Sequence, residues 1–236
     1  MTAFEPFNTT RDWRARGYIM RTPPLMLVAY DPAGDGKDRD AVVMIGREEL
    51  QHGEVWDPDF AVMTMFRVQM AFEMPPAFEF PDKLAMLLNL HTQLRSWQAK
   101  GRIVNYVFCP ETNGVGYAMA STLRSKIGNH VQPYVTVARI TDDRVIESRT
   151  AMPRMAGLDH MRVLAETHCL KMARGAPGAQ ELTKQMDAFV WRRPGRPEAI
   201  EGQHDDMVMA AAGAIWIGSK VIPPILKARS FRQRTH

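Results

Sequence analysis

The sequence has little cysteine and no long apolar run, and both absences narrow the class of protein. Its two cysteines, Cys109 and Cys169, stand far apart, with no CxxC or CxxH spacing around them. This leaves neither a zinc site nor a disulfide framework, and it indicates buried thiols in a reducing compartment. No apolar stretch reaches membrane-spanning length. Residues 1–8 lack the basic and apolar regions of a signal peptide, so we expect a cytoplasmic protein that needs no membrane.

A nucleotide-binding phosphate loop is also missing, although residues 34–37 look like one. They follow an apolar run, but the first glycine of a GxxxxGK pattern would fall at Asp31. Lys37 is followed by Asp38 rather than by serine or threonine, and a strand rather than a helix comes next. The sequence therefore predicts no nucleotide-triphosphate motor in these residues.

What the chain does have is enough apolar content for one large domain. Hydrophobic residues make up 45% of its 236 residues, which suffices for a single core with a small appendage. The net charge of +4 is compatible with a polyanionic partner without requiring one. We expect a basic leader over residues 1–24, a folded domain over 25–218 and a basic tail over 219–236.

The domain is organised around residues 25–31, a short apolar run that stops at the carboxylate of Asp31. Such a run, bounded by turn formers, is typical of a buried strand. The apolar pattern resumes over 41–46, which predicts a hairpin with a charged tip. Asp38 and Asp40 at this tip are interpreted as solvated charge in preference to outer-shell acids or DNA-loop residues. Residues 60–68 predict a third antiparallel strand. On this segment alone, an Asx-turn explains Asp31 better than catalysis does.

A second predicted strand also ends at an acid. Residues 81–101 have the spacing of an amphipathic crossover helix, in which His91 is interpreted as a core residue. Residues 103–109 then predict a strand, which is followed by Glu111 and a glycine-containing turn. If this strand is the parallel neighbour of the first, Asp31 and Glu111 lie at the same edge of the sheet.

The rest of the chain predicts helices over 117–127, 158–173 and 179–186, a fifth strand over 134–138 and a charged loop over 142–154. Its most informative segment is 201–216, where Asp205 and Asp206 begin an Ala- and Met-rich helix. This helix is apolar nearly all round and hence buried. Acids in a first helical turn are ordinary caps, but two acids preceded by His204 exceed what one cap needs.

Together, these acidic blocks resemble the nuclease domain of phage terminase large subunits, in the ribonuclease H-like superfamily. The likeness rests on residues 31–34, on 111–116 and above all on the Gly-x-His-Asp-Asp block at 202–206, and it covers roughly residues 25–218. It implies an α/β fold with a ribonuclease H-like mixed sheet, an antiparallel meander plus parallel strands, flanked by helices. That family also has an ATPase motor, whose phosphate-loop motif these residues lack, so the resemblance implies either a piece of a longer protein or a split or remnant terminase.

By that resemblance, Asp31, Glu111 and Asp205 would be the catalytic metal ligands, and Asp206 a fourth acid that either binds the second ion or orients the other ligands. Gathered carboxylates stay ionised only with cations among them, and oxygen ligands select Mg²⁺ or Mn²⁺. Two such ions about 3.5–4 Å apart would activate a water and stabilise the attacking and leaving oxygens of a phosphodiester. The expected activity is cleavage of double-stranded viral DNA during genome packaging, with little sequence specificity.

The resemblance also implies partners: double-stranded DNA, a small terminase subunit, a portal protein and an ATPase motor domain, in the host cell cytoplasm. Phosphate contacts are expected from basic residues outside the acidic blocks, namely Lys37, Arg39, Arg124, Lys126, Arg149, Arg192, Arg193 and Arg196. Arg154 is a further candidate of this kind. Two alternatives stay open. One is a junction-resolvase-like nuclease, and the other a non-catalytic docking module that uses the basic tail and Met-rich surfaces.

Overall fold

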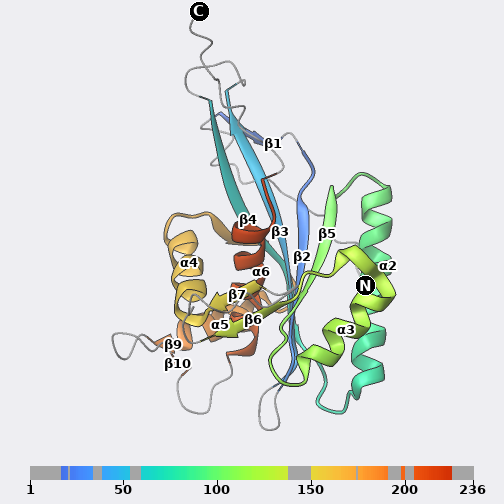
Figure 1. Cartoon of the computed structure of the whole chain (residues 1–236). Helices are drawn as coiled ribbons and strands as arrows, with labels where there is room; N and C mark the ends of the chain where they lie inside the picture. The colour runs from blue at the N-terminus through green and yellow to red at the C-terminus, as the bar shows by residue number, and fades with distance from the viewer. Residues whose placement is uncertain are drawn as a thin grey trace, which may run out of the picture.

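The structure, a computed structural model, describes residues 17–20, 22–33, 39–53, 60–137, 150–173, 175–190, 198–199 and 205–224. Its centre is a mixed sheet with helices on both faces (Figure 1). Three consecutive strands form an antiparallel meander: β2 (Leu25–Asp31), β3 (Ala41–His52) and β4 (Ala61–Glu73). The predicted hairpin and third strand are confirmed, and β4 runs further than residues 60–68.

Parallel strands extend the meander on both sides. β5 (Asn105–Pro110) pairs with β2, and β8 (Leu170–Met172) pairs with β4, which gives the order β5-β2-β3-β4-β8. A short strand, β1 (Tyr18–Met20), pairs with the far end of β3. The predicted fold, an antiparallel meander plus parallel strands, is therefore confirmed.

Helices cover each face of this sheet (Figure 1). One face carries α2 (Phe80–Ala99) and α3 (Gly116–Ile127), which continues into a 3₁₀ turn at Gly128–His130. The other carries α4 (Arg154–Glu166), α5 (Ala179–Ala188) and α6 (Asp206–Trp216), which continues into a π-helical turn at Ile217–Val221. Two small pairs complete the fold: β6 (Tyr134–Val137) with β7 (Thr150–Pro153), and β9 (Phe189–Val190) with β10 (Glu198–Ala199).

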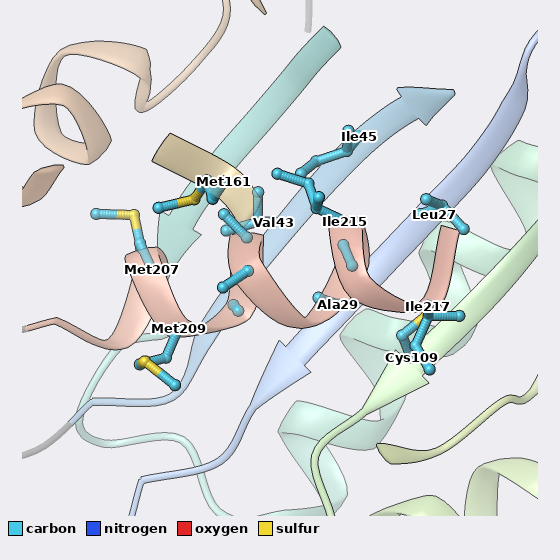
Figure 2. Close-up of a cluster of buried hydrophobic side chains, with 14 of the residues drawn as sticks. Leu27, Ala29, Val43, Ile45, Cys109, Met161, Met207, Met209, Ile215 and Ile217 are labelled. Carbon is cyan, nitrogen blue, oxygen red and sulfur yellow. The ribbon is translucent and has the colours of Figure 1, made fainter. Parts of the chain in front are cut away.

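Strand β2 is apolar on both faces because both faces are covered. Successive side chains of a strand point to opposite sides, so Leu27 and Ala29 meet α6 whereas Met26 and Val28 meet the α2 side. In Figure 2, α6 crosses the central strands with its apolar side chains against those of β2 and β3. Burying one such side chain contributes about 1.5–3 kcal/mol. This packing is what holds the start of α6 near the end of β2.

The chain after β6 departs from the sequence-based expectations. The helix expected over 158–173 starts earlier and ends at Glu166; His168 adopts a positive φ of 58°, and the following residues form β8. Pairing with β4 outweighs local helical spacing there. The charged loop expected over 142–154 is also wrong at its end, where β7 and the start of α4 lie. Residues 138–149 are outside the described part.

The fifth strand is present as β6, and it pairs with β7 in a separate two-stranded sheet. Isolated bridges around the ends of β5 and β6 join Phe108 to Val131 and Glu111 to Tyr134. The alternative of a docking module invoked Met-rich surfaces. Many methionines lie in the core: Met26, Met44, Met65, Met74, Met119, Met152, Met161, Met207 and Met209. No helix within the described ranges is long and apolar enough to cross a membrane.

Candidate metal-binding site

The parallel pairing of β2 with β5 brings Asp31 and Glu111 to one edge of the sheet. Tyr30 lies opposite Pro110 in this register, and the backbone N–H of Glu111 donates to the carbonyl of Tyr30 at 2.8 Å. Each acid follows the last apolar residues of its strand, so both leave the core at the same level. The two strands are thus parallel neighbours, which was the condition for Asp31 and Glu111 to share a site.

The N-terminus of α6 brings Asp205 and Asp206 to the same edge. The pKa of Asp31 is raised well above its ordinary value, first by burial and then by the charge of Glu111 and a hydrogen bond with its side chain. The charges of Asp206 and Asp205 raise the pKa of Asp31 further. The acidic cluster, defined as Asp31, Glu111, Asp205 and Asp206, therefore lies within mutual electrostatic reach.

Asp31 does not make the Asx-turn hydrogen bond to the backbone N–H of Ala33. The carboxylate that accepts the backbone N–H of Ala33, at 3.2 Å, belongs to Asp40. Asp40 is buried, accepts the hydroxyl of Tyr30 at 2.6 Å and pairs with Lys83 on α2. Its interpretation as solvated charge was therefore wrong, because the chain folds back and covers it. Asp31 is relieved of a local structural task.

Asp205 does not cap its own helix in the ordinary way either. Asp205 occupies the N-cap position and makes no side-chain cap hydrogen bond. The backbone N–H of Met207 instead donates to Oε1 of the buried Gln185 on α5, at 3.1 Å. Gln185 thus makes the cap contact that Asp205 would otherwise supply. An ordinary helix cap therefore does not explain Asp205.

A short network connects this cap to the hairpin tip. Nε2 of Gln185 donates to Oε1 of Glu73 at 3.0 Å, and Arg39 pairs with the other carboxylate oxygen of Glu73 at 3.0 Å. The backbone N–H of Arg39 donates to Oδ2 of Asp206 at 3.1 Å. The start of α6 and the start of β3 are therefore held together beside the acidic cluster.

Glu111 is oriented by its own turn. Nδ2 of Asn113 donates to Oε1 of Glu111 at 2.7 Å and to the carbonyl of Thr136 at 3.1 Å. The turn closes tightly at Gly116, where an added Cβ would lie 2.0 Å from the carbonyl oxygen of Glu111. Only glycine fits so close to this carbonyl, which explains the glycine at the start of α3.

Tyr134 lies beneath the acidic cluster and locks α6 in place. Its side chain is fully buried, and an added Cβ on Gly213 of α6 would stand 2.2 Å from its ring. Burial, followed by the charges of Glu111 and Asp31, raises the pKa of the Tyr134 hydroxyl well above its ordinary value. Tyr134 therefore stays neutral and acts as a wedge between the end of β5 and α6.

The donor chemistry of the acidic cluster fits hard divalent cations. It supplies carboxylate oxygens only, and the pKa of Asp31 is raised first by burial and then by the neighbouring carboxylates, both of which a bound cation would offset. In the described part of the chain, however, no three His, Cys, Asp or Glu side chains converge closely enough to hold an ion as they stand. Asp205 is turned to Arg154, whose Nη2 lies 2.5 Å from Oδ2.

Of the basic residues expected to contact DNA, the structure describes Arg39, Arg124 and Lys126. Arg124 and Lys126 are exposed in the last turn of α3, which begins at the site and carries them roughly 12–15 Å along the helix. Arg39 adjoins the acidic cluster, with its side chain 48% exposed. The others lie outside the described residues, as do Asp38 and His204: Lys37, Arg149, Arg192, Arg193 and Arg196.

Sequence reasoning missed Gln185 and the role of Asp40, and it did not connect Arg154 with Asp205. Gln185 carried a usable signal, because it shares a face of α5 with the buried Leu182 and Ala188. A polar side chain on such a face needs a partner. Nothing near Arg154 in the sequence indicates Asp205, which lies 51 positions away.

These features define an α/β fold with a mixed sheet between two layers of helices and with acids at the carboxyl edge of that sheet. No protein-family model matches the sequence, and no curated protein matches it significantly. Solved structures do match. The human cytomegalovirus terminase nuclease domain, Mn-soaked and inhibitor-bound, aligns with a TM-score of 0.54 at 11% identity over 92% of both chains. The Mn-soaked form gives 0.52 at 13% identity over 91% of this chain and 89% of that one.

A third structure of that viral domain aligns with a TM-score of 0.51 at 12% identity, over 84% of this chain and 85% of the other. At such identities the likeness concerns the fold. The chain has the fold of the terminase nuclease domain, as the sequence motifs indicated.

Proposed function

We propose that the protein is a metal-dependent endonuclease that cuts double-stranded DNA with little sequence specificity, as the nuclease part of a viral DNA-packaging terminase. The observation that supports this most is the acidic cluster at the carboxyl edge of β2 and β5, where the pKa of Asp31 is raised by burial, Glu111, Asp206 and Asp205. A fold gains no stability from repelling carboxylates. Their arrangement makes sense as a cation site.

Asp31, Glu111 and Asp205 would hold Mg²⁺ or Mn²⁺, with Asp206 as a further ligand. The ions would lower the pKa of a bound water and stabilise the charge that develops on the phosphodiester oxygens. The protein's own contribution is position. Asn113 fixes the Glu111 carboxylate at 2.7 Å, and the network of Gln185 and Arg39 fixes the start of α6.

The packaging role adds a setting to this chemistry. Double-stranded DNA is the proposed substrate, and an ATPase motor domain, a small terminase subunit and a portal protein are the proposed partners. The alternative of a docking module is less well supported, because the methionines it would use are largely buried. A junction resolvase would share the acidic chemistry but would require branched DNA, so comparing branched with linear duplex substrates separates the two nucleases.

Cleavage of supercoiled plasmid tests the proposal. We expect nicked and linear products with Mn²⁺ or Mg²⁺, none with EDTA, and cut positions spread over the plasmid. Asp31→Asn and Asp205→Asn should each lower the rate at least about 100-fold, because a metal site supplies several kcal/mol of transition-state stabilisation.

The matched control is Asp159→Asn. Asp159 is an exposed acid on α4 that pairs with Arg162 and does not contact the acidic cluster, so its variant should cut like the wild type. A folded wild-type protein that fails to cut with any of these metals, and whose melting temperature Mn²⁺ does not raise, would contradict the proposal.

A further inference from the structure

Arg154 makes a contact whose role goes beyond cleavage itself. Its Nη2 donates to Oδ2 of Asp205 at 2.5 Å, and the two side chains are 39% and 24% exposed. Both partners are therefore within reach of solvent, and so of a dissolved cation. The ion pair is accessible, unlike the deeply buried pairs elsewhere in the protein.

The position of Arg154 is not explained by its own helix. It is the first residue of α4, and the first turn of α4 contains no acidic side chain. A helix N-terminus carries partial positive charge, so a cation there is unfavourable for the helix. The favourable partner of Arg154 must therefore lie outside α4, and Asp205 is that partner.

Asp205 is not explained by its own helix either. As the residue that precedes α6, it could cap the free N–H groups there, yet it makes no such hydrogen bond and Gln185 does so in its place. Arg154 at the start of α4 and Asp205 before α6 thus pair with each other rather than with groups of their own helices. This pairing is a feature of the tertiary fold.

Elements on both sides of Arg154 in the sequence position it near Asp205. β7, which ends at Pro153 just before Arg154, pairs in parallel with β6, and β6 begins at Tyr134 beside Glu111. Leu158 of α4 is buried in the same core cluster as α6. The strand before Arg154 therefore pairs with a strand that adjoins Glu111, and the helix after it shares a core with α6.

We propose that Arg154 is the internal counter-ion of the site: it holds Asp205 while metal is absent and competes with a divalent cation for that carboxylate. This inference rests on the proposed metal site. Its electrostatic reason is that the acidic cluster repels itself, so one cation at its rim reduces the repulsion. It also accounts for the arrangement of the acids, which do not converge while Asp205 faces Arg154.

Isothermal titration with Mn²⁺ tests the competition directly, on the full chain stripped of metal. Arg154→Gln keeps hydrogen-bonding capacity and removes the charge, so Mn²⁺ should bind about five- to tenfold more tightly than to the wild type, as expected for loss of a partly exposed charged competitor. The melting temperature of metal-free Arg154→Gln should fall, and its rise on adding Mn²⁺ should be larger.

The matched control is Arg162→Gln. Arg162 is on the same helix with its side chain 51% exposed, and it pairs with Asp159 and Glu166 rather than with the acidic cluster. Its variant should bind Mn²⁺ as the wild type does. Crystal structures with and without Mn²⁺ give a second readout, in which the contact between Arg154 and Asp205 should be present only without the metal.

The outcomes separate this inference from the proposed function. If the wild type binds Mn²⁺ and Arg154→Gln binds it equally or less tightly, the counter-ion role is overturned while the metal site stands. The counter-ion role is likewise overturned if the ion pair persists in the Mn²⁺-bound crystal. If neither protein binds Mn²⁺, the metal site itself fails, and the counter-ion role fails with it.

Discussion

Strand β3 borders two regions of buried charge that differ in balance. Near its middle, Arg47 and Glu49 form an ion pair at 3.0 Å, and Glu48 pairs with Arg67 from β4. Near its start, the acidic cluster gathers carboxylates around Asp31. In the first region each buried charge has an opposite partner. In the second, the first three effects on the pKa of Asp31 are burial, the charge of Glu111 and a hydrogen bond with it, and all raise that pKa.

The comparison distinguishes buried charges that stabilise the fold from buried charges that are suited to binding a ligand. Arg47 also donates to the carbonyls of Gly218, Ile222 and Pro223, so its guanidinium ties the turn after α6 to the sheet. Such a satisfied pair is typical of structure. Unbalanced acids at a strand edge are typical of a functional site.

The largest effect on stability is expected from breaking the balanced region. Arg47→Ala removes the cation that pairs with the buried Glu49 carboxylate and the donor to three backbone carbonyls, so the free energy of unfolding should fall by about 3–5 kcal/mol. Denaturant unfolding measures this. Replacing Arg47 by Met together with Glu49 by Leu should cost clearly less, because no buried charge is then left alone. Equal losses in the single and double variants would show that the ion pair is not what matters there.

A smaller loss of folding stability is expected at the contact between α5 and the N-terminus of α6. Gln185→Ala removes the group that accepts the N–H of Met207, and loss of a helix cap typically costs about 1–2 kcal/mol. The plasmid cleavage rate should fall as well, since the start of α6 loses its anchor. Thr183→Ala, on the exposed side of the same helix, is the control and should change stability by no more than about 0.5 kcal/mol. Unchanged stability in Gln185→Ala would remove its capping role.

The smallest effect has the opposite sign. Asp31→Asn should stabilise the metal-free protein by about 1 kcal/mol at neutral pH, since one pKa unit corresponds to about 1.4 kcal/mol. Between about pH 3.9 and the raised pKa of the folded protein, Asp31 is protonated in the folded protein and ionised in the unfolded chain. The stability of the wild type therefore falls as the pH rises through this range.

The advantage of Asp31→Asn should therefore vanish below about pH 4 and be complete above the folded pKa of Asp31. Thermal melting of both proteins from pH 3.5 to 8 in EDTA measures it. A variant that is less stable than the wild type at neutral pH would mean that Asp31 has a structural role after all.

The sequence predicted those parts of the molecule that local patterns determine. Apolar runs that stop at Asp31 and at Glu111 placed both acids at strand ends, and the apolar helix after Asp206 predicted its own burial. Tertiary contacts decided the rest. The residues of β8 looked helical until pairing with β4 made them a strand, and Asp40 looked solvated until Lys83 and Tyr30 covered it.

Anomalous diffraction from Mn²⁺-soaked crystals would test the central claim most directly. We predict anomalous peaks coordinated by Asp31, Glu111 and Asp205, about 3.5–4 Å apart if two ions bind, and their loss at this place in Asp31→Asn crystals. Peaks elsewhere on the protein, with none among the acidic cluster at saturating Mn²⁺, would contradict it.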